Sequence, residues 1–202
     1  MRIIVTTAEV APIAKTGGLG DVCGSLPQAL AALGHDVVVF MPFYRQAREY
    51  FERSGQPIEI AQPTTAITWN DWAAELTVFR STLPGSQVPL YLLANDYFFN
   101  RDQIYSGRLD GHDDNLERYT FFSRAVIRTC EMLGLYPEIL HAHDWHTALL
   151  PVFLHSGLRG SENFRGTRSV FTIHNLNYQG VGGLDRFHFL GLHDRYRRGD
   201  AL

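Results

Sequence analysis

Cysteine is scarce in this chain, and apolar residues form no long run. Cys23 and Cys130 are the only cysteines among 202 residues, and they lie far apart. This excludes a disulfide framework and is typical of a protein from a reducing compartment. The amino terminus lacks the roughly 7–15-residue apolar stretch of a signal peptide, and no segment approaches the ~20 apolar residues of a membrane span. We therefore expect a cytoplasmic protein that does not act at a membrane.

An excess of charge of either sign is also missing. Eighteen basic and 21 acidic residues give a formal net charge of -3, which provides no general attraction to nucleic acid. The chain is 45% hydrophobic, 12% aromatic and 19% charged, as in ordinary water-soluble globular proteins. This composition excludes a disordered, collagen-like or coiled-coil chain. The ligands we expect are neutral, or are recognised by a local group of residues.

Strand-like and helix-like segments alternate along most of the chain. In order, the sequence predicts a strand at 2–7, a helix at 19–33, a strand at 36–41, an antiparallel insertion or edge at 58–94, an ordered loop at 95–114, a helix at 116–133, a strand at 138–143, a helix at 147–155 and a strand at 169–174. The first helix is predicted to bury Leu19, Val22, Leu26, Leu30 and Leu33. This order predicts an α/β domain with a mainly parallel sheet, whose ligands bind beyond the carboxyl ends of the strands.

A glycine-rich turn follows the first predicted strand. Lys15 precedes Gly17, Gly18 and Gly20, and a helix starts there, so a cation and backbone amides come together as a phosphate group requires. The spacing is neither that of a Walker loop nor that of the dinucleotide fingerprint. The alternative is a turn that needs glycine only for its backbone angles. Glu9, just before this turn, is either a solvated carboxylate or a hydrogen-bond acceptor beside the glycines.

A histidine cluster follows a later strand. His141, His143, Asp144 and His146 lie within six residues, and three imidazoles with a carboxylate are able to gather a metal ion. A metal-dependent hydrolase is therefore one reading of the sequence. The order of residues departs from the H-x-H-x-D-H pattern of dinuclear metallohydrolases, because Asp144 stands in the fourth place. We expect His141 to be a core histidine bonded to backbone groups.

A string of uncharged polar residues follows the last predicted strand. Residues 174–180 read His-Asn-Leu-Asn-Tyr-Gln-Gly, and such side chains suit the hydroxyls of a neutral sugar. The alternative is a turn capped by asparagine side chains. Arg195, Arg197 and Arg198 are expected on a solvated face rather than around a diphosphate. The aromatic string 97–99 fits either the core or a surface that stacks on sugar rings.

Three strings together resemble those of bacterial glycogen synthases and plant starch synthases: residues 15–22, 141–146 and 171–180. The resemblance covers roughly residues 1–182. It implies the Rossmann-like amino-terminal half of a two-domain glycosyltransferase of the GT-B type. Residues 1–202 would then be a truncated amino-terminal catalytic domain that lacks the carboxy-terminal nucleotide-binding domain, and we expect it not to turn over alone. No transit peptide is recognised, which favours the bacterial glycogen synthases.

The resemblance also implies an activity. It is retaining transfer of glucose from ADP-glucose to the non-reducing end of an α-1,4-glucan, with no metal ion and no other cofactor. The partners are therefore the nucleotide sugar and glycogen or a maltooligosaccharide, with no nucleic acid and no membrane. Besides the hydrolase, a non-catalytic glucan-binding module remains an alternative.

Carried over residue by residue, the resemblance places Lys15 near the diphosphate and glucose of the donor. Gly17 and Gly18 supply backbone donors there. Asp21 shapes the site and counts among the catalytic residues, and Glu9 belongs to the substrate-binding set.

The opposite side of the implied site comes from the later strings. His174 lies beside the anomeric carbon and acts through its main-chain carbonyl, while Asn175 binds the sugar. Asp144 and His146 belong to the wall of the cleft. Phe99 stands near a position where the family often has a tyrosine that contacts the donor, and it would keep the stacking without the hydroxyl.

Overall fold

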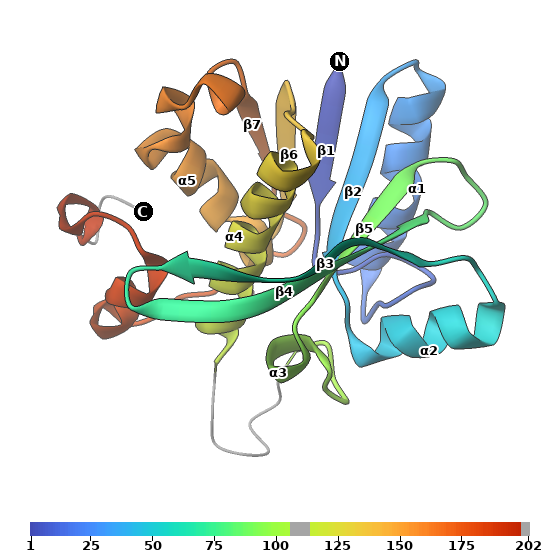
Figure 1. Cartoon of the computed structure of the whole chain (residues 1–202), viewed down its shortest axis with the longest axis horizontal. Coiled ribbons are helices and arrows are strands. Elements are labelled where there is room, and N and C mark those ends of the chain that lie inside the picture. Colours follow the sequence, from blue (N-terminus) through green and yellow to red (C-terminus); the bar gives the residue numbers. More distant parts are fainter. Residues whose placement is uncertain (106–113, 199–202) are drawn as a thin grey trace.

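The computed structural model describes residues 1–105 and 114–198 as an open seven-stranded sheet with helices packed against it (Figure 1). The strands are β1 (Arg2–Thr6), β2 (Asp36–Pro42), β3 (Glu59–Trp69), β4 (Trp72–Thr82), β5 (Pro89–Ala94), β6 (Ile139–His143) and β7 (Arg168–Thr172). The α-helices are α1 (Gly18–Ala32), α2 (Arg45–Ser54), α3 (Asp96–Phe99), α4 (Asn115–Leu133) and α5 (Leu149–Ser156). Short 3₁₀ turns are η1 (Trp145–Thr147), η2 (Leu158–Gly160), η3 (Glu162–Phe164), η4 (Leu184–Leu190) and η5 (Asp194–Tyr196).

The order of the strands explains where a ligand site forms. It runs β3-β4-β5-β2-β1-β6-β7, with β5, β2, β1, β6 and β7 parallel. From β1 the chain proceeds to β2 on one side and later returns to β6 on the other. The strand order therefore reverses at β1, and a crevice opens beyond the carboxyl ends of β1 and β6. The α/β fold with a mainly parallel sheet is confirmed.

The predicted insertion at 58–94 is confirmed as an antiparallel edge. The long strands β3 and β4 form a hairpin, β4 pairs antiparallel with β5, and β5 joins the parallel part through β2. The tip of the hairpin reaches across to η4, where the Trp69 indole donates to the Phe189 carbonyl at 2.8 Å and the Trp72 ring packs on Phe189. This contact fixes the chain that follows residues 174–183.

The buried residues agree with the prediction for the central strand but only in part for the first helix. Val37, Val38, Val39 and Phe40 are fully buried in the centre of the sheet, as a continuous apolar run predicts. The buried side of α1 is instead Leu19, Gly20, Cys23 and Pro27, while Val22 and Leu33 are exposed. The predicted apolar face is therefore right for Leu19 and for Leu30, which packs against the core, and wrong for Val22 and Leu33, because a small cysteine and a proline face the core instead. Helix α2 was not predicted.

Helix α1 approaches the preceding loop so closely that one position requires glycine. A Cβ added at Gly24 would lie 2.7 Å from the backbone oxygen of Ala11. In an exposed helix, Gly to Ala stabilises by roughly 1 kcal/mol. Here we expect Gly24→Ala to destabilise the protein by about 1–3 kcal/mol, because backbone must move.

Urea unfolding of this variant beside Gly18→Ala checks the prediction. A Cβ at Gly18 meets nothing within 4 Å, so that variant should unfold at or slightly above the wild-type midpoint. A Gly24→Ala protein as stable as the wild type would contradict the close approach.

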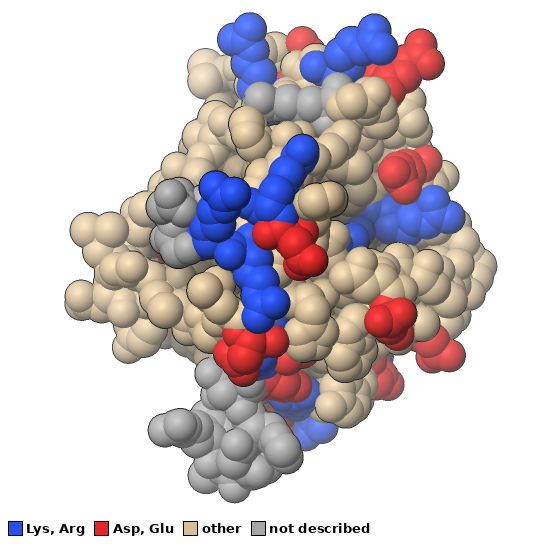
Figure 2. All heavy atoms as spheres, turned by 90° about the vertical axis from the view of Figure 1, so that its left-hand side faces the viewer, with Lys and Arg blue, Asp and Glu red and all other residues tan. Residues whose placement is uncertain are grey.

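The predicted surface arginines lie at the end of the described chain. Arg195, Arg197 and Arg198 are exposed, on and after η5. Figure 2 shows the face that carries this part of the chain, where basic and acidic side chains lie next to one another. The solvated face expected for these arginines is confirmed. Among the described residues, no helix has the length and apolar character needed to cross a membrane.

Candidate active site

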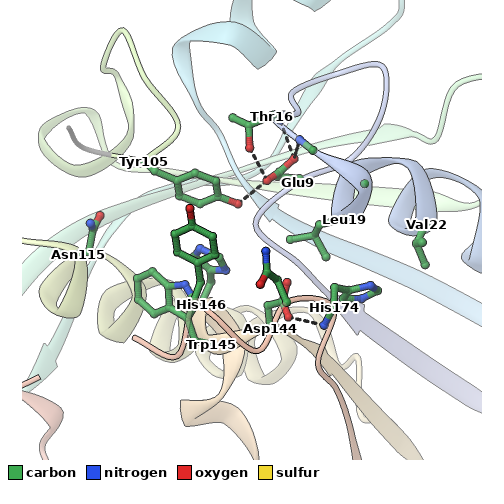
Figure 3. Close-up of a pocket in the computed structure, with 14 residues that line it drawn as sticks. Glu9, Thr16, Leu19, Val22, Tyr105, Asn115, Asp144, Trp145, His146 and His174 are labelled. Carbon is green, nitrogen blue, oxygen red and sulfur yellow. Dashed lines mark hydrogen bonds between the residues drawn. The ribbon is translucent and has the colours of Figure 1, made fainter. Parts of the chain in front are cut away.

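A pocket of about 800 Å³ lies beyond the carboxyl ends of β1, β6 and β7. Its walls come from the loops after these strands, from the start of α1 and α4, and from the segment after α3 (Figure 3). The lining residues are Glu9, Thr16, Gly17, Gly18, Leu19, Val22, Tyr105, Asn115, Asp144, Trp145, His146, His174, Asn175 and Tyr178. The expected convergence of three strand-end loops on one rim is confirmed, since each of the three strings contributes to the lining.

Glu9 accepts hydrogen bonds from the glycine turn and so fixes its position. Glu9 is 3% exposed, and its carboxylate accepts hydrogen bonds from the Thr16 N–H (2.6 Å), the Thr16 hydroxyl (2.8 Å) and the Gly17 N–H (3.0 Å). Of the two readings of Glu9, the acceptor beside the glycines is therefore the right one. The Gly17 N–H, expected to face a phosphate, points at Glu9 because a buried carboxylate requires donors. The amides of the first turn of α1, which starts at Gly18, have no acceptor within the helix.

Lys15 and Asp21 lie beside the pocket rather than among its lining residues. The Lys15 ammonium and the Asp21 carboxylate form an ion pair at 2.5 Å, with side chains 40% and 60% exposed. Lys15 is the only lysine in the sequence. The two residues that were predicted separately thus form one exposed pair at the start of α1.

Asp144 holds the last loop of the site in place. Its carboxylate accepts the backbone N–H of His174 at 2.6 Å, and its own N–H donates to the Thr172 carbonyl at 2.9 Å. Asp144 has a positive φ of 57°, a conformation that costs a non-glycine residue about 1–3 kcal/mol. Such strain persists where the surroundings impose it, and here it aims a buried carboxylate at the backbone of His174. The loops after β6 and β7 are therefore joined at the pocket.

The histidines of this cluster contact other side chains of the protein. His143 Nδ1 and His174 Nε2 share a hydrogen bond of 2.9 Å, and His141 Nε2 lies 2.8 Å from the Thr172 hydroxyl. His141 is half-buried and bonds a side chain rather than the expected backbone groups. His146 lies between the rings of Tyr105 and Tyr119, both at 4.7 Å. Within residues 1–105 and 114–198, no three His, Cys, Asp or Glu side chains are placed to hold a metal ion, which disfavours the hydrolase reading.

Burial keeps the inner imidazoles neutral. Desolvation, with smaller contributions from His141 and His174, lowers the pKa of His143 to about 3. Desolvation and the nearby Arg118 guanidinium lower the pKa of His146 to about 3 as well. His143 Nε2 and His146 Nδ1 are buried with no hydrogen-bond partner. These rings are thus neutral structural groups at physiological pH.

The string 174–180 forms the exposed lip of the pocket. Asn175 is exposed, and its side chain accepts the Asn177 N–H at 3.0 Å, so the asparagine-capped turn exists and lies at the pocket. Gly180, with φ of 63°, lies against the Trp145 indole, where a Cβ would come within 2.3 Å of the ring. The turn and the sugar-facing reading are therefore compatible, because Asn175, Tyr178 and Trp145 all line the pocket.

The aromatic residue that reaches the pocket is Tyr105, not Phe99. Phe99 is fully buried and packs on Tyr44, Phe121 and Phe122, so its expected contact with the donor is wrong. Tyr105 belongs to the loop predicted at 95–114, of which residues 106–113 lie outside the described residues. No local pattern marked Tyr105 within that aromatic loop, since its partners are distant in sequence.

The reversal of strand order at β1 and the pocket beside it define an open α/β sheet that binds its ligand at the reversal, and the match to a solved starch synthase structure makes this the fold of a GT-B glycosyltransferase domain. A solved structure, the catalytic domain of starch synthase IV from Arabidopsis thaliana bound to ADP and acarbose, matches with a TM-score of 0.81 and 27% identity, over 98% of this chain and 39% of that one. The model of the family described as starch synthase catalytic domain matches residues 2–202, and the chain belongs to this family.

Curated relatives agree with this assignment. The chain is 40% identical over 194 residues to a glycogen synthase of Pseudothermotoga lettingae, which covers 95% of this chain and 38% of the relative. It is 42% identical over 183 residues to a glycogen synthase of Moorella thermoacetica, which covers 90% of this chain and 34% of the relative. The chain thus spans well under half the length of these relatives.

Proposed function

We propose that this chain forms one wall of the active site of a glucosyltransferase. In this proposal the whole enzyme moves glucose, with retention, from ADP-glucose to the non-reducing end of an α-1,4-glucan in the cytoplasm. The observation that carries the proposal is the match to a starch synthase structure that holds ADP and acarbose. In addition, the pocket of this chain lies where the strand order reverses, which is where such sheets bind ligands. Because the matched relatives are more than twice as long, we propose that residues 1–202 alone bind the donor weakly without turnover.

The start of α1 suits the diphosphate of a nucleotide sugar. Cleavage of a glycosyl phosphate builds negative charge on the leaving diphosphate and positive charge on the sugar, so fixed dipoles and cations near the phosphate favour the transition state. Helix α1 begins at Gly18, which lines the pocket, so the first amides of this helix and the positive end of its dipole lie at the pocket. Lys15 exchanges its contact with Asp21 for the phosphate in our proposal, and Asp21 keeps the ammonium in place until then.

The opposite wall suits the sugar. The His174 carbonyl is proposed to face the anomeric carbon, where it stabilises an oxocarbenium-like transition state, and Asn175 is proposed to bind a sugar hydroxyl. Support comes from Asp144, which fixes the backbone of His174 through a 2.6 Å hydrogen bond, and from His146, whose neutral ring packs in the wall. The reaction requires no metal ion or other cofactor in this proposal.

Removal of the Lys15 cation tests the donor site. We expect Lys15→Ala to weaken ADP-glucose binding about tenfold or more, because a charge-assisted contact to phosphate is lost. The measurement is a titration of chelator-treated, isotopically labelled protein that follows the amides of Gly17, Gly18, Gly20 and Asn175 and the Trp145 indole. Lys15→Arg keeps the charge and should bind more tightly than Lys15→Ala, while Arg195→Ala removes a cation away from the pocket and should bind like the wild type.

The same samples separate the alternatives. Equal ADP-glucose affinity of wild type and Lys15→Ala would refute the role of Lys15. Shifts with maltooligosaccharide but none with ADP-glucose would support the glucan-binding module. Stoichiometric zinc in the purified protein before chelator treatment would support the hydrolase. Since Lys15 is the only lysine, protection of its amine by ADP-glucose against acetylation gives an independent check.

A further inference from the structure

The carboxylate of Glu9 has a fourth donor that comes from a distant part of the chain. The Tyr105 hydroxyl donates to Glu9 Oε1 at 2.5 Å, across 96 positions of sequence (Figure 3). Oε1 thereby receives Tyr105 and the Thr16 hydroxyl, while Oε2 receives the N–H groups of Thr16 and Gly17. Three of the four bonds hold the glycine turn to Glu9. The fourth connects this assembly to the other side of the pocket.

Tyr105 is itself held firmly. Its ring stacks on His146 with centroids 4.7 Å apart and an angle of 24°. The residue before it is fixed by Arg118, a fully buried side chain of α4 that donates to the Ile104 carbonyl at 2.9 Å. Burial raises the pKa of the Tyr105 phenol, and the bond to Glu9 raises it further, so the phenol remains a proton donor at physiological pH. Tyr105 is therefore a well-anchored donor that keeps its proton at physiological pH.

We propose that Tyr105 is a positioning residue for the donor site. It acts through Glu9: the phenol anchors the carboxylate, and the carboxylate sets the position of the turn that leads from Lys15 into α1. This inference rests on the proposed function, since the ligand it affects is the nucleotide sugar. In this proposal Tyr105 acts on the donor site through Glu9, so a maltooligosaccharide, which carries no diphosphate for the turn to hold, binds independently of the Tyr105 hydroxyl.

Removal of one oxygen atom tests the proposal. Tyr105→Phe keeps the ring on His146 and takes away the hydroxyl. We expect the amides of Thr16 and Gly17 to exchange with solvent about tenfold faster, as loss of one hydrogen bond to a charged group implies, and ADP-glucose to bind about tenfold more weakly. Affinity for maltooligosaccharide should stay unchanged. Tyr97→Phe, an identical change at a side chain that is 74% exposed and outside the pocket lining, should alter none of these values.

Amide exchange and ADP-glucose binding test this proposal and the proposed function separately. Amide exchange requires no ligand, so unchanged exchange at Thr16 and Gly17 in Tyr105→Phe overturns the proposal even if the enzyme binds ADP-glucose. Faster exchange with unchanged ADP-glucose affinity also overturns it, because the turn would then not matter for the donor. If the wild type binds no ADP-glucose at all, the proposed function fails.

A measurement on the wild type covers the case in which the variant does not fold. An exchange-protected hydroxyl proton that correlates with the Tyr105 ring supports the bond to Glu9. A Tyr105 hydroxyl that exchanges as fast as that of exposed Tyr97 overturns it.

Discussion

Replacing Arg118 by leucine is expected to lower the free energy of unfolding by about 3–5 kcal/mol, the cost of leaving buried partners of a charged group unsatisfied. Arg118 is 0% exposed. Its guanidinium donates to the carbonyls of Phe98 (2.8 Å) and Ile104 (2.9 Å) and to the Asn115 side chain (2.9 Å). A leucine leaves these two backbone acceptors without their donor. Because both carbonyls lie in the segment that presents Tyr105, the pocket should loosen along with the fold.

Urea unfolding of three variants checks this expectation. Arg118→Lys keeps the charge but has no planar fork, so it should fall between wild type and Arg118→Leu. Arg128→Leu is the matched control, since it lies on the same helix with a side chain that is 50% exposed, and it should change stability by no more than about 0.5 kcal/mol. Equal midpoints for Arg118→Leu and Arg128→Leu would show that the buried guanidinium does not anchor the segment.

The parallel core of the fold could be predicted because its strands are apolar runs. Val37 to Phe40 are buried on both sides, and a strand of that kind is visible in the sequence. Helix α2 could not be predicted in the same way, because it buries only Ala47 and Phe51 and is otherwise polar. The face of α1 was misjudged since hydrophobicity favoured Val22 and Leu33, whereas Cys23 and Pro27 have the size that packs against the sheet.

The position of the site could be predicted from the strand topology, but the hydrogen bonds between its residues could not. Glu9, Asp144 and His174 follow three strands whose carboxyl ends meet, and this was enough to expect one pocket. The bonds from Asp144 to the His174 backbone and from Tyr105 to Glu9 join residues 30 and 96 positions apart. Such pairs depend on loop conformation, which residue spacing does not encode. For the same reason, the hydrogen bond from the Gly17 N–H to Glu9 could not be predicted.

Acidification from pH 7 to pH 5 is expected to cost about 4 kcal/mol of stability, roughly 2 kcal/mol for each of His143 and His146. Both imidazoles have a pKa of about 3 in the folded protein, below the ordinary value of 6.5. Between these pH values the unfolded chain binds protons that the folded chain does not. Stability is therefore complete above pH 6.5 and is lost as the pH falls toward 3.

Urea midpoints at pH 7, 6 and 5 measure this loss, and single variants assign it. His146→Phe keeps an aromatic ring between Tyr105 and Tyr119 and removes one titrating group, so its stability should fall only about half as much over the same range. The exposed His155 on α5 provides the control, and His155→Phe should show the full wild-type dependence. If His146→Phe and wild type lost equal stability between pH 7 and pH 5, His146 would have to accept its proton within the fold. Water would then have to reach the His146 ring beside Tyr105, contrary to the 6% exposure of His146.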